Sequence, residues 1–200
     1  MQVASIIPSS KQVIRLVSSK FDFSEPRVIV EYGPGEGCHT REIVRQMHQG
    51  STLLLFELDP ELANHLRHQF RHDHRVHVIN ATANDISIEL HKRGIEHCDY
   101  IVSGIPFSTM EIKTKRALLK QTFEALAPKP TSAFIIYQIT NELRQHAREF
   151  PRVESEYCLQ NIPPNFVTVF YKQPLNGHKS HNGHAHATAS NGNGNGNGRH

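Results

Sequence analysis

The stretch VIVEYGPGEGCHT, residues 28–40, constrains the fold of this 200-residue chain more than any other segment. Its first part is short, apolar and β-branched, which is typical of a buried parallel strand. Glu31 lies near the end of that strand, and Gly33, Gly35 and Gly37 follow at every second position. We therefore expect a strand, then a loop with almost no side chains, then a helix. A backbone of this kind lets a ligand approach closely.

Strands and helices alternate along the rest of the chain. After the first strand we predict four apolar strands and one late strand of alternating pattern, in the segments STLLLFELD, RVHVIN, DYIVSGIP, SAFIIYQIT and NFVTVFYK. The late strand is predicted to lie at a sheet edge. Strands that alternate with helices indicate βαβ units and a parallel sheet, so the fold class is α/β. Ligands of such sheets bind at the carboxyl ends of the strands.

Three helices are predicted between these strands. The segment TREIVRQM has its apolar residues on one face. The segment DPELANHLRHQF begins with Asp59 as the N-cap and Pro60 in the first turn, a combination typical of helix starts. The segment EIKTKRALLKQTFEAL is amphipathic and is ended by the following APKP. Each helix can therefore bury an apolar face on the sheet.

A further helix is predicted over residues 9–20, capped by Ser9 or Ser10. It has an apolar face and a basic fringe, and the basic residues are Lys11, Arg15 and Lys20. Two interpretations stay open. The helix either packs on the sheet or covers a ligand site there, or it lies on an anionic lipid surface.

The chain is long enough for one α/β domain with a buried core. We predict an N-terminal helical segment at residues 1–24, the main domain at 25–175 and a disordered tail at 176–200. The tail has no large apolar residue and ends in repeated Asn-Gly, so it cannot bury enough surface to become ordered. Its five histidines are interpreted as solvated rather than as a metal site.

Charge and cysteine usage exclude several classes of protein. The net charge of +3 permits an anionic partner but does not require one. Cys38, Cys98 and Cys158 form no C-x-x-C pair, which argues against a zinc site and a disulfide framework. An odd cysteine count without a signal peptide predicts a cytoplasmic protein. No apolar run reaches the roughly 18 residues of a membrane span.

The glycine spacing is not that of a phosphate-binding loop. In the dinucleotide fingerprint G-x-G-x-x-G the third glycine would fall on Cys38, and no G-K-[ST] follows to make a P-loop. Glu31 would also repel a phosphate. A carboxylate at this place suits a cationic group, such as the α-ammonium of an amino acid.

A second acid completes the pattern. Glu57 lies 20 residues beyond Gly37, at the end of the next predicted strand, where a carboxylate can accept both hydroxyls of a ribose. S-adenosylmethionine combines a ribose, an adenine and a cationic amino acid. The glycine loop and the acid together therefore indicate S-adenosylmethionine as the cofactor.

The segments VEYGPGEG, FELDPELA and ATANDI resemble the first three motifs of class I S-adenosylmethionine-dependent methyltransferases. The resemblance implies a Rossmann-like fold with a mostly parallel seven-stranded sheet, an antiparallel edge strand and helices on both faces. It also implies the cofactor-binding set: Glu31, Gly33, Gly35 and Gly37 for the methionine part, Glu57 and Leu58 for the ribose segment, and Ala83 and Asp85 for the adenine. Many members have Gly-Asp-Ala in the third loop, where this chain has Ala-Thr-Ala.

The segment SGIPF, residues 103–107, follows the fourth strand, where amino methyltransferases often carry [DN]-P-P-[YF] or N-[IL]-P-Y. By this resemblance Ser103 replaces the Asn or Asp, Gly104 and Ile105 offer carbonyls to an amine, and Phe107 supplies an aromatic ring. These four are the candidate catalytic residues, and no metal is expected.

Together with IIPSSKQVIRLV and NIPPNFVTVFYK, the SGIPF segment is similar to the soluble bacterial phospholipid N-methyltransferases. The resemblance implies N-methylation of phosphatidylethanolamine or a related aminolipid headgroup by a monomer that is cytoplasmic or peripheral on the inner membrane face. Nucleic acid is not the expected partner, because the loop lacks the Asn and Tyr of ribosomal RNA adenine dimethyltransferases and the fold is predicted to stop near residue 175. The alternatives are such an RNA enzyme, a small-molecule amine methyltransferase, or a binding protein without chemistry.

Overall fold

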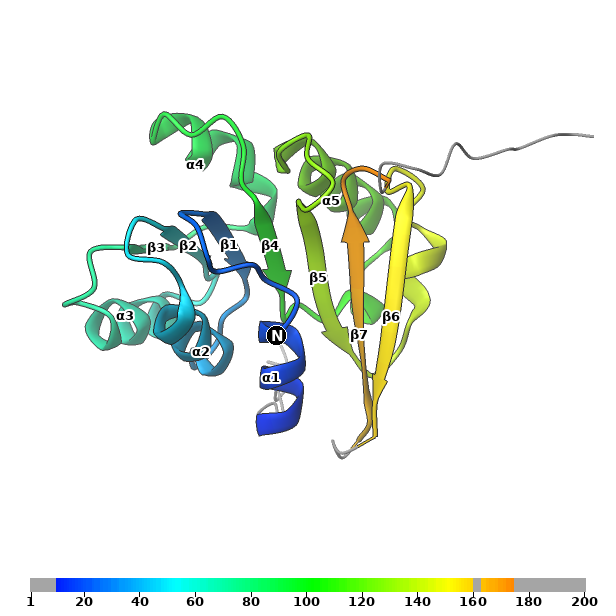
Figure 1. Ribbon diagram of the computed structural model, residues 1–200, viewed down its shortest axis with the longest axis horizontal. Coiled ribbons are helices and arrows are strands. Elements are labelled where there is room, and N and C mark those ends of the chain that lie inside the picture. The colour runs from blue at the N-terminus through cyan, green and yellow to red at the C-terminus, as the bar shows by residue number, and fades with distance from the viewer. Residues whose placement is uncertain (1–9, 160–162, 175–200) are drawn as a thin grey trace, which may run out of the picture.

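The computed structural model describes residues 10–159 and 163–174. Within them the chain forms a seven-stranded sheet in the order β3-β2-β1-β4-β5-β7-β6 (Figure 1). The strands are β1 (Val28–Tyr32), β2 (Thr52–Phe56), β3 (Val76–Ile79), β4 (Tyr100–Ser103), β5 (Ala133–Gln138), β6 (Arg152–Cys158) and β7 (Asn165–Tyr171). The predicted tail lies outside the described residues, as do Ser9 and the start of the NIPP segment.

Strands β1 to β5 are parallel to one another, and β7 is antiparallel to both β5 and β6. The predicted α/β class with a mostly parallel seven-stranded sheet is confirmed. The prediction that NFVTVFYK forms the edge was wrong, because β7 lies between two strands. The edge strand is β6, RVESEYC, whose side chains are mostly polar and exposed and so give little apolar signal in the sequence.

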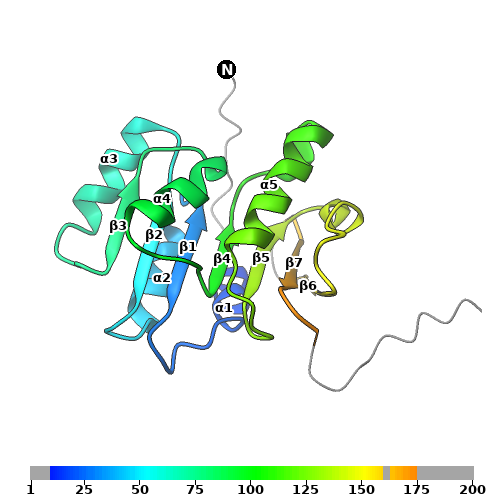
Figure 2. The ribbon, with the colours of Figure 1, turned by 90° about the horizontal axis from the view of Figure 1, so that it is seen from above.

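Two groups of helices cover the two faces of the sheet (Figure 2). One core cluster joins the strands to α1, α2 and α3, and the other joins them to α4 and α5. Of these helices, α4 was not predicted from the sequence. The helices are α1 (Lys11–Ser18), α2 (Cys38–Gln46), α3 (Pro60–Gln69), α4 (Ile86–Lys92) and α5 (Ile112–Ala125), with short 3₁₀ turns η1 (Ala83–Asp85), η2 (Phe107–Thr109) and η3 (Glu142–Gln145).

The cap residues behave as the sequence predicts. The side chain of Asp59 accepts hydrogen bonds from the backbone of Glu61 and Leu62, and Pro60 opens α3. Ser10 caps α1 by accepting from the amide of Val13. Because the first amides of a helix have no partner inside it, such caps fix where the helix begins.

Helix α1 packs against the sheet and α2. Val13 and Val17 are fully buried against strand residues such as Ile135 and Val167, and α1 lies beside α2. The interpretation that the apolar face packs on the sheet is therefore correct for these residues. The basic side chains Lys11 and Arg15 stay exposed to solvent.

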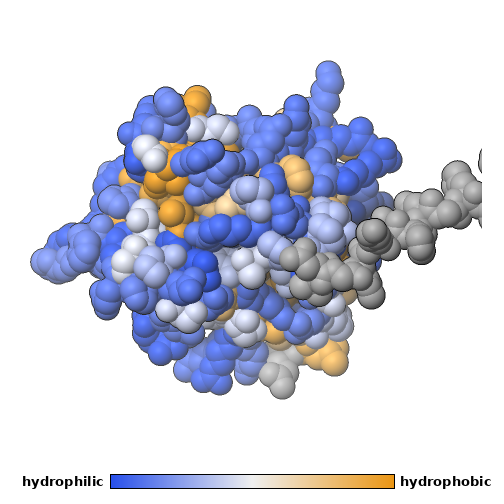
Figure 3. Space-filling view, turned by 45° about the horizontal axis from the view of Figure 1, so that its top comes forward, coloured by the Kyte–Doolittle hydropathy of each residue, from blue (hydrophilic) through white to orange (hydrophobic). Residues whose placement is uncertain are grey.

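The molecular surface is mostly hydrophilic on the face shown in Figure 3, where apolar residues appear only in separate groups. Large exposed apolar side chains include Leu58 and Ile139, which both follow strand ends, and Leu159 next to the β6–β7 turn. None of the helices in the described part of the chain has the length and apolar character needed to cross a membrane.

Candidate active site

The glycine loop after β1 has a backbone that only glycine adopts readily. Gly33, Gly35 and Gly37 have φ values of +62°, +56° and +75°. A Cβ on Gly37 would lie 3.0 Å from Leu66 of α3, and one on Gly33 would lie 3.1 Å from Ile105. A Cβ on Gly35 would meet nothing within 4 Å. All three positions therefore favour glycine through their backbone conformation, Gly33 and Gly37 are also closely packed, and Gly35 lines open space.

Glu31 is buried at the end of β1, with 1% of its surface exposed. Its Oε2 accepts a hydrogen bond of 2.7 Å from the hydroxyl of Thr40, while Oε1 is buried without a partner among the described residues. Burial raises the pKa of Glu31 to about 7, and the nearby carboxylate of Glu57 adds to the rise. A buried acceptor without a donor is costly unless a ligand pairs with it.

Glu57 joins the loop after β2 to the glycine loop. Its Oε2 accepts a hydrogen bond of 3.0 Å from the Gly35 amide, and its Oε1 accepts one of 3.0 Å from the Asp59 amide. Each carboxylate oxygen keeps a further lone pair for a hydroxyl donor. Asn80, at the end of β3, donates from Nδ2 to the carbonyls of Glu57 and Leu58 and so fixes this segment.

The loop after β3 holds the predicted adenine residues. Ala83 is half-buried against the core, and Asp85 closes the η1 turn by accepting from the amide and hydroxyl of Thr82, each at 3.2 Å. Leu58 lies 63% exposed after Glu57. We call the loops after β1, β2 and β3 the cofactor corner. They meet at one edge of the sheet, as parallel strands require.

Two of the predicted catalytic side chains are buried. Ser103 is fully buried, and its hydroxyl accepts a hydrogen bond of 3.2 Å from the Ile105 amide, which shapes the turn. Phe107 is also fully buried and packs edge-on against Phe134, with ring centroids 6.0 Å apart. Both side chains are enclosed by their neighbours in this structure, so they stabilise the loop after β4.

Gly104 lies where three segments crowd together. A Cβ at this position would come within 2.5 Å of the Tyr137 hydroxyl and 3.1 Å of the Gly33 carbonyl. The Gly104 amide donates to the Tyr32 carbonyl at 3.0 Å. Glycine is therefore required here, and the crowding brings the end of β4 against the glycine loop. We call the ends of β4 and β5, the loops that follow them and the first turn of α2 the acceptor corner.

The acceptor corner contains a stacked aromatic pair that the sequence did not indicate. The ring of His39, in the first turn of α2, stacks on Tyr137 with centroids 4.0 Å apart. Burial lowers the pKa of His39 to about 4 and raises that of Tyr137 well above its usual value, so both rings are neutral. Both ring nitrogens of His39 are buried without a hydrogen-bond partner in the described ranges.

Gln138 is the third residue of this corner that sequence reasoning missed. It ends β5 and is 9% exposed, and its Nε2 donates a 2.6 Å hydrogen bond to the carbonyl of Ile105. Tyr137 and Gln138 are the last two residues of an apolar strand. The rule that ligands bind at the carboxyl ends of strands was therefore a signal that could have found them.

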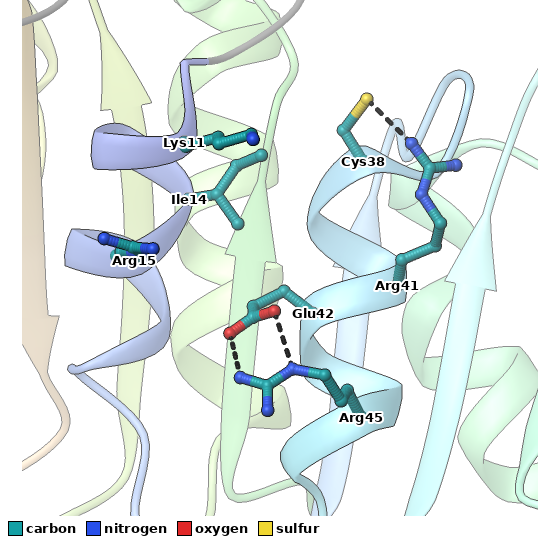
Figure 4. Close-up of a pocket in the computed structure, with 7 residues that line it drawn as sticks. All are labelled: Lys11, Ile14, Arg15, Cys38, Arg41, Glu42 and Arg45. Atoms are coloured by element: carbon teal, nitrogen blue, oxygen red, sulfur yellow. Dashed lines mark hydrogen bonds and ion pairs between the residues drawn. The ribbon is translucent and has the colours of Figure 1, made fainter.

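A cleft of about 520 Å³ lies between α1 and α2 (Figure 4). Lys11 and Ile14 on α1 face α2 across it. Its charged residues are four cations and one carboxylate, and that carboxylate, Glu42, is paired with Arg45 at 2.6 Å. The lining residues are Lys11, Ile14, Arg15, Cys38, Arg41, Glu42 and Arg45. One lining residue, Cys38, is next in sequence to His39, whose ring stacks on Tyr137.

Comparison with known proteins identifies the family. The model of the ribosomal RNA adenine dimethylase family matches residues 5–148. The chain belongs to this family of S-adenosylmethionine-dependent methyltransferases. It is also 30% identical, over 162 residues, to an ornithine lipid N-methyltransferase of Singulisphaera acidiphila, an alignment that covers 81% of this chain and 84% of that protein.

Solved structures agree on the fold of the methyltransferase. The N-methyltransferase NodS of Bradyrhizobium japonicum matches with a TM-score of 0.67 and 11% identity, covering 80% of this chain and 94% of that one. Precorrin-6y C5,15-methyltransferase of Geobacter metallireducens matches with a TM-score of 0.64 and 14% identity, covering 86% and 94%. The Rossmann-like class I methyltransferase fold is therefore confirmed.

The cofactor of this N-methyltransferase is S-adenosylmethionine. The residues present fit it: Glu31 has a buried oxygen without a donor, and Gly35 leaves space where any other residue would carry a Cβ. When bound, the cofactor supplies a methyl group that its sulfonium makes electrophilic. The protein then has to hold the acceptor in line with that methyl group and to keep the acceptor's lone pair free.

Proposed function

We propose that this methyltransferase methylates the amine of an aminolipid headgroup, phosphatidylethanolamine or a related aminolipid. The basic cleft between α1 and α2 carries the proposal, since its lining residue Cys38 precedes His39, whose ring stacks on Tyr137 at the end of β5. An amine in an aminolipid headgroup lies close to a phosphate or a carboxylate, so its enzyme needs a cation near the site. The likeness to an ornithine lipid N-methyltransferase supports this acceptor class.

The charges in the cleft favour an anionic group. Lys11 and Arg15 are exposed and form no ion pair with any residue in the described ranges. Among the described residues, the guanidinium of Arg41 donates hydrogen bonds only within its own segment, to the Glu36 carbonyl at 2.9 Å and the Cys38 sulfur at 3.2 Å. These cations attract a headgroup phosphate and, on a vesicle, the anionic lipids around it. We expect activity to fall as salt rises.

The cofactor corner completes the proposal. Glu31 pairs with the α-ammonium of the cofactor, Glu57 accepts the ribose hydroxyls, and the segment of Ala83 and Asp85 borders the adenine. At the acceptor corner the carbonyl of Gly104 accepts an N–H of the amine. The amine must lose a proton before it reacts, and burial beside a cationic sulfonium favours the neutral form.

The second candidate is methylation of ribosomal RNA adenine, which the description of the matching family model favours. The acceptor loop argues against it, because Ser103 and Phe107 replace the Asn and Tyr that the RNA enzymes carry, and both side chains are buried here.

One experiment separates the two candidates. Purified protein is incubated with labelled S-adenosylmethionine and either vesicles of phosphatidylethanolamine with anionic lipid, vesicles with an ornithine lipid, or ribosomal RNA. Label in a lipid supports the proposal, whereas label in RNA alone overturns it. The double variant Lys11→Ala and Arg15→Ala should lower the rate on vesicles about tenfold or more, at roughly 1 kcal/mol per basic residue. The matched control is Lys113→Ala and Arg116→Ala, two exposed basic residues of α5.

A further inference from the structure

Gln138 has a buried oxygen that the fold does not use. Its Oε1 is buried and has no hydrogen-bond partner in the part of the chain that the structure describes, while its Nε2 is bound to the carbonyl of Ile105. The orientation of the carboxamide follows from chemistry, because a carbonyl only accepts and so must face the NH₂ group. The remaining oxygen is therefore an acceptor that is held in place and needs an N–H or O–H donor.

The sheet register places this oxygen at the acceptor corner. Ser103 pairs with Ile136 across β4 and β5, and Gln138 lies two residues further on the same face of β5. It therefore lies beside Ile105, just past the end of β4. The Gly104 carbonyl, one residue earlier, accepts no hydrogen bond from the described residues. Two acceptors without donors thus lie at one corner of the sheet.

Ser103 does not fill this role. Its hydroxyl already accepts a hydrogen bond of 3.2 Å from the Ile105 amide, whereas Oε1 of Gln138 accepts none from the described residues. A serine is also too short to extend as far as the Asn or Asp found at this position in related loops. The neighbouring strand supplies a carboxamide instead.

We propose that Gln138 is a catalytic residue that binds the acceptor amine. Its Oε1 accepts one N–H of the neutral amine and the Gly104 carbonyl accepts the other, so the lone pair faces the methyl group. The amine nitrogen uses that lone pair to form the new N–C bond, while the S–C bond breaks and its electron pair stays on sulfur. The product carries one extra proton, which leaves to water. This inference rests on the N-methyltransferase activity and not on the identity of the acceptor.

The test compares acceptors that differ in their number of N–H groups. Gln138→Leu keeps the size of the side chain but removes its polar atoms. We expect kcat/KM for an unmethylated acceptor to fall about tenfold, and for a monomethylated acceptor to fall less. A dimethylated amine has no N–H in its neutral form, so its turnover, or its inhibition constant as a competitor, should change less than about twofold. S-adenosylmethionine binding, measured by calorimetry, should be unchanged.

The matched control is Gln121→Leu, because Gln121 in the second half of α5 also has a buried oxygen without a partner. It should leave all acceptor constants unchanged. Equal losses for all acceptors would overturn the proposal, since they would show that Gln138 only shapes the loop. The assay uses whichever acceptor the enzyme methylates, lipid or RNA. If RNA is that acceptor, the aminolipid function fails while the test of Gln138 still applies.

Discussion

The cofactor corner and the acceptor corner differ in how they use side chains. At the cofactor corner the polar groups come from the residues that the motif indicates: Glu31 keeps a buried oxygen free, and Glu57 binds the glycine loop. At the acceptor corner the motif residues Ser103 and Phe107 are buried as supports. The groups that remain available there come from β5 and α2. A local motif can therefore specify a cofactor site while the acceptor site depends on neighbouring strands.

The largest expected effect is a loss of stability at the acceptor corner. Phe107→Ala removes a fully buried ring that packs on Phe134, and the free energy of unfolding should fall by about 3–5 kcal/mol. Chemical denaturation measures this loss. The control Ile112→Ala removes an exposed apolar side chain nearby and should cost little. An unchanged unfolding free energy with a raised KM for the acceptor would show instead that the ring contacts the amine.

The next effect tests the cofactor corner. Glu57→Ala removes a carboxylate that we assign to the ribose, and S-adenosylmethionine binding should weaken by about 1–3 kcal/mol. Isothermal titration calorimetry gives the affinity directly. Glu61→Ala is the control, because Glu61 lies exposed one turn away on α3. Equal affinity in Glu57→Ala and the wild type would contradict the ribose assignment.

A pH titration sharpens the comparison, since only the cofactor corner holds a buried carboxyl with a pKa of about 7. Cofactor binding needs the ionised form of Glu31, so affinity should rise about eightfold from about pH 6 to about pH 7.5. In the protein without cofactor, folding stability has the opposite pH dependence. The folded state holds the Glu31 proton more tightly than the unfolded state, so this contribution to stability falls as the pH rises from the usual carboxyl pKa to about 7.

The variant Glu31→Gln provides the control for this titration, because it has no proton to lose. Its affinity for S-adenosylmethionine should be lower and nearly independent of pH. A wild-type affinity that does not change with pH would show that Glu31 does not pair with the cofactor ammonium.

The smallest effect is expected for Ser103→Ala. The hydroxyl makes one hydrogen bond inside the turn, so stability should fall by about 1 kcal/mol. Turnover should stay within about threefold of the wild type, because Gln138 is proposed to bind the amine. A loss of turnover with unchanged thermal stability would assign the amine contact to Ser103.

The sequence alone predicted the alternation of strands and helices that builds the cofactor corner and the residues assigned to it. Glu31, the three glycines and Glu57 lie within about 30 residues of one another, and strand periodicity, positive-φ glycines and helix caps are all local properties. The predicted cap at Asp59 was confirmed for the same reason. The edge strand was misassigned because β6 is polar and its place depends on pairing with β7, which is not a local property.

Only the tertiary structure decided the acceptor corner. Gln138 lies 33 residues from Ile105 in the sequence, and His39 lies nearly 100 residues from Tyr137, yet each pair is in contact. The parallel register of β4 and β5 brings the first pair together, and the packing of α2 on the sheet brings the second. Whether a buried polar atom has a partner depends on every neighbour around it. The tertiary structure was therefore needed to recognise that Oε1 of Gln138 is a buried acceptor without a partner among the described residues.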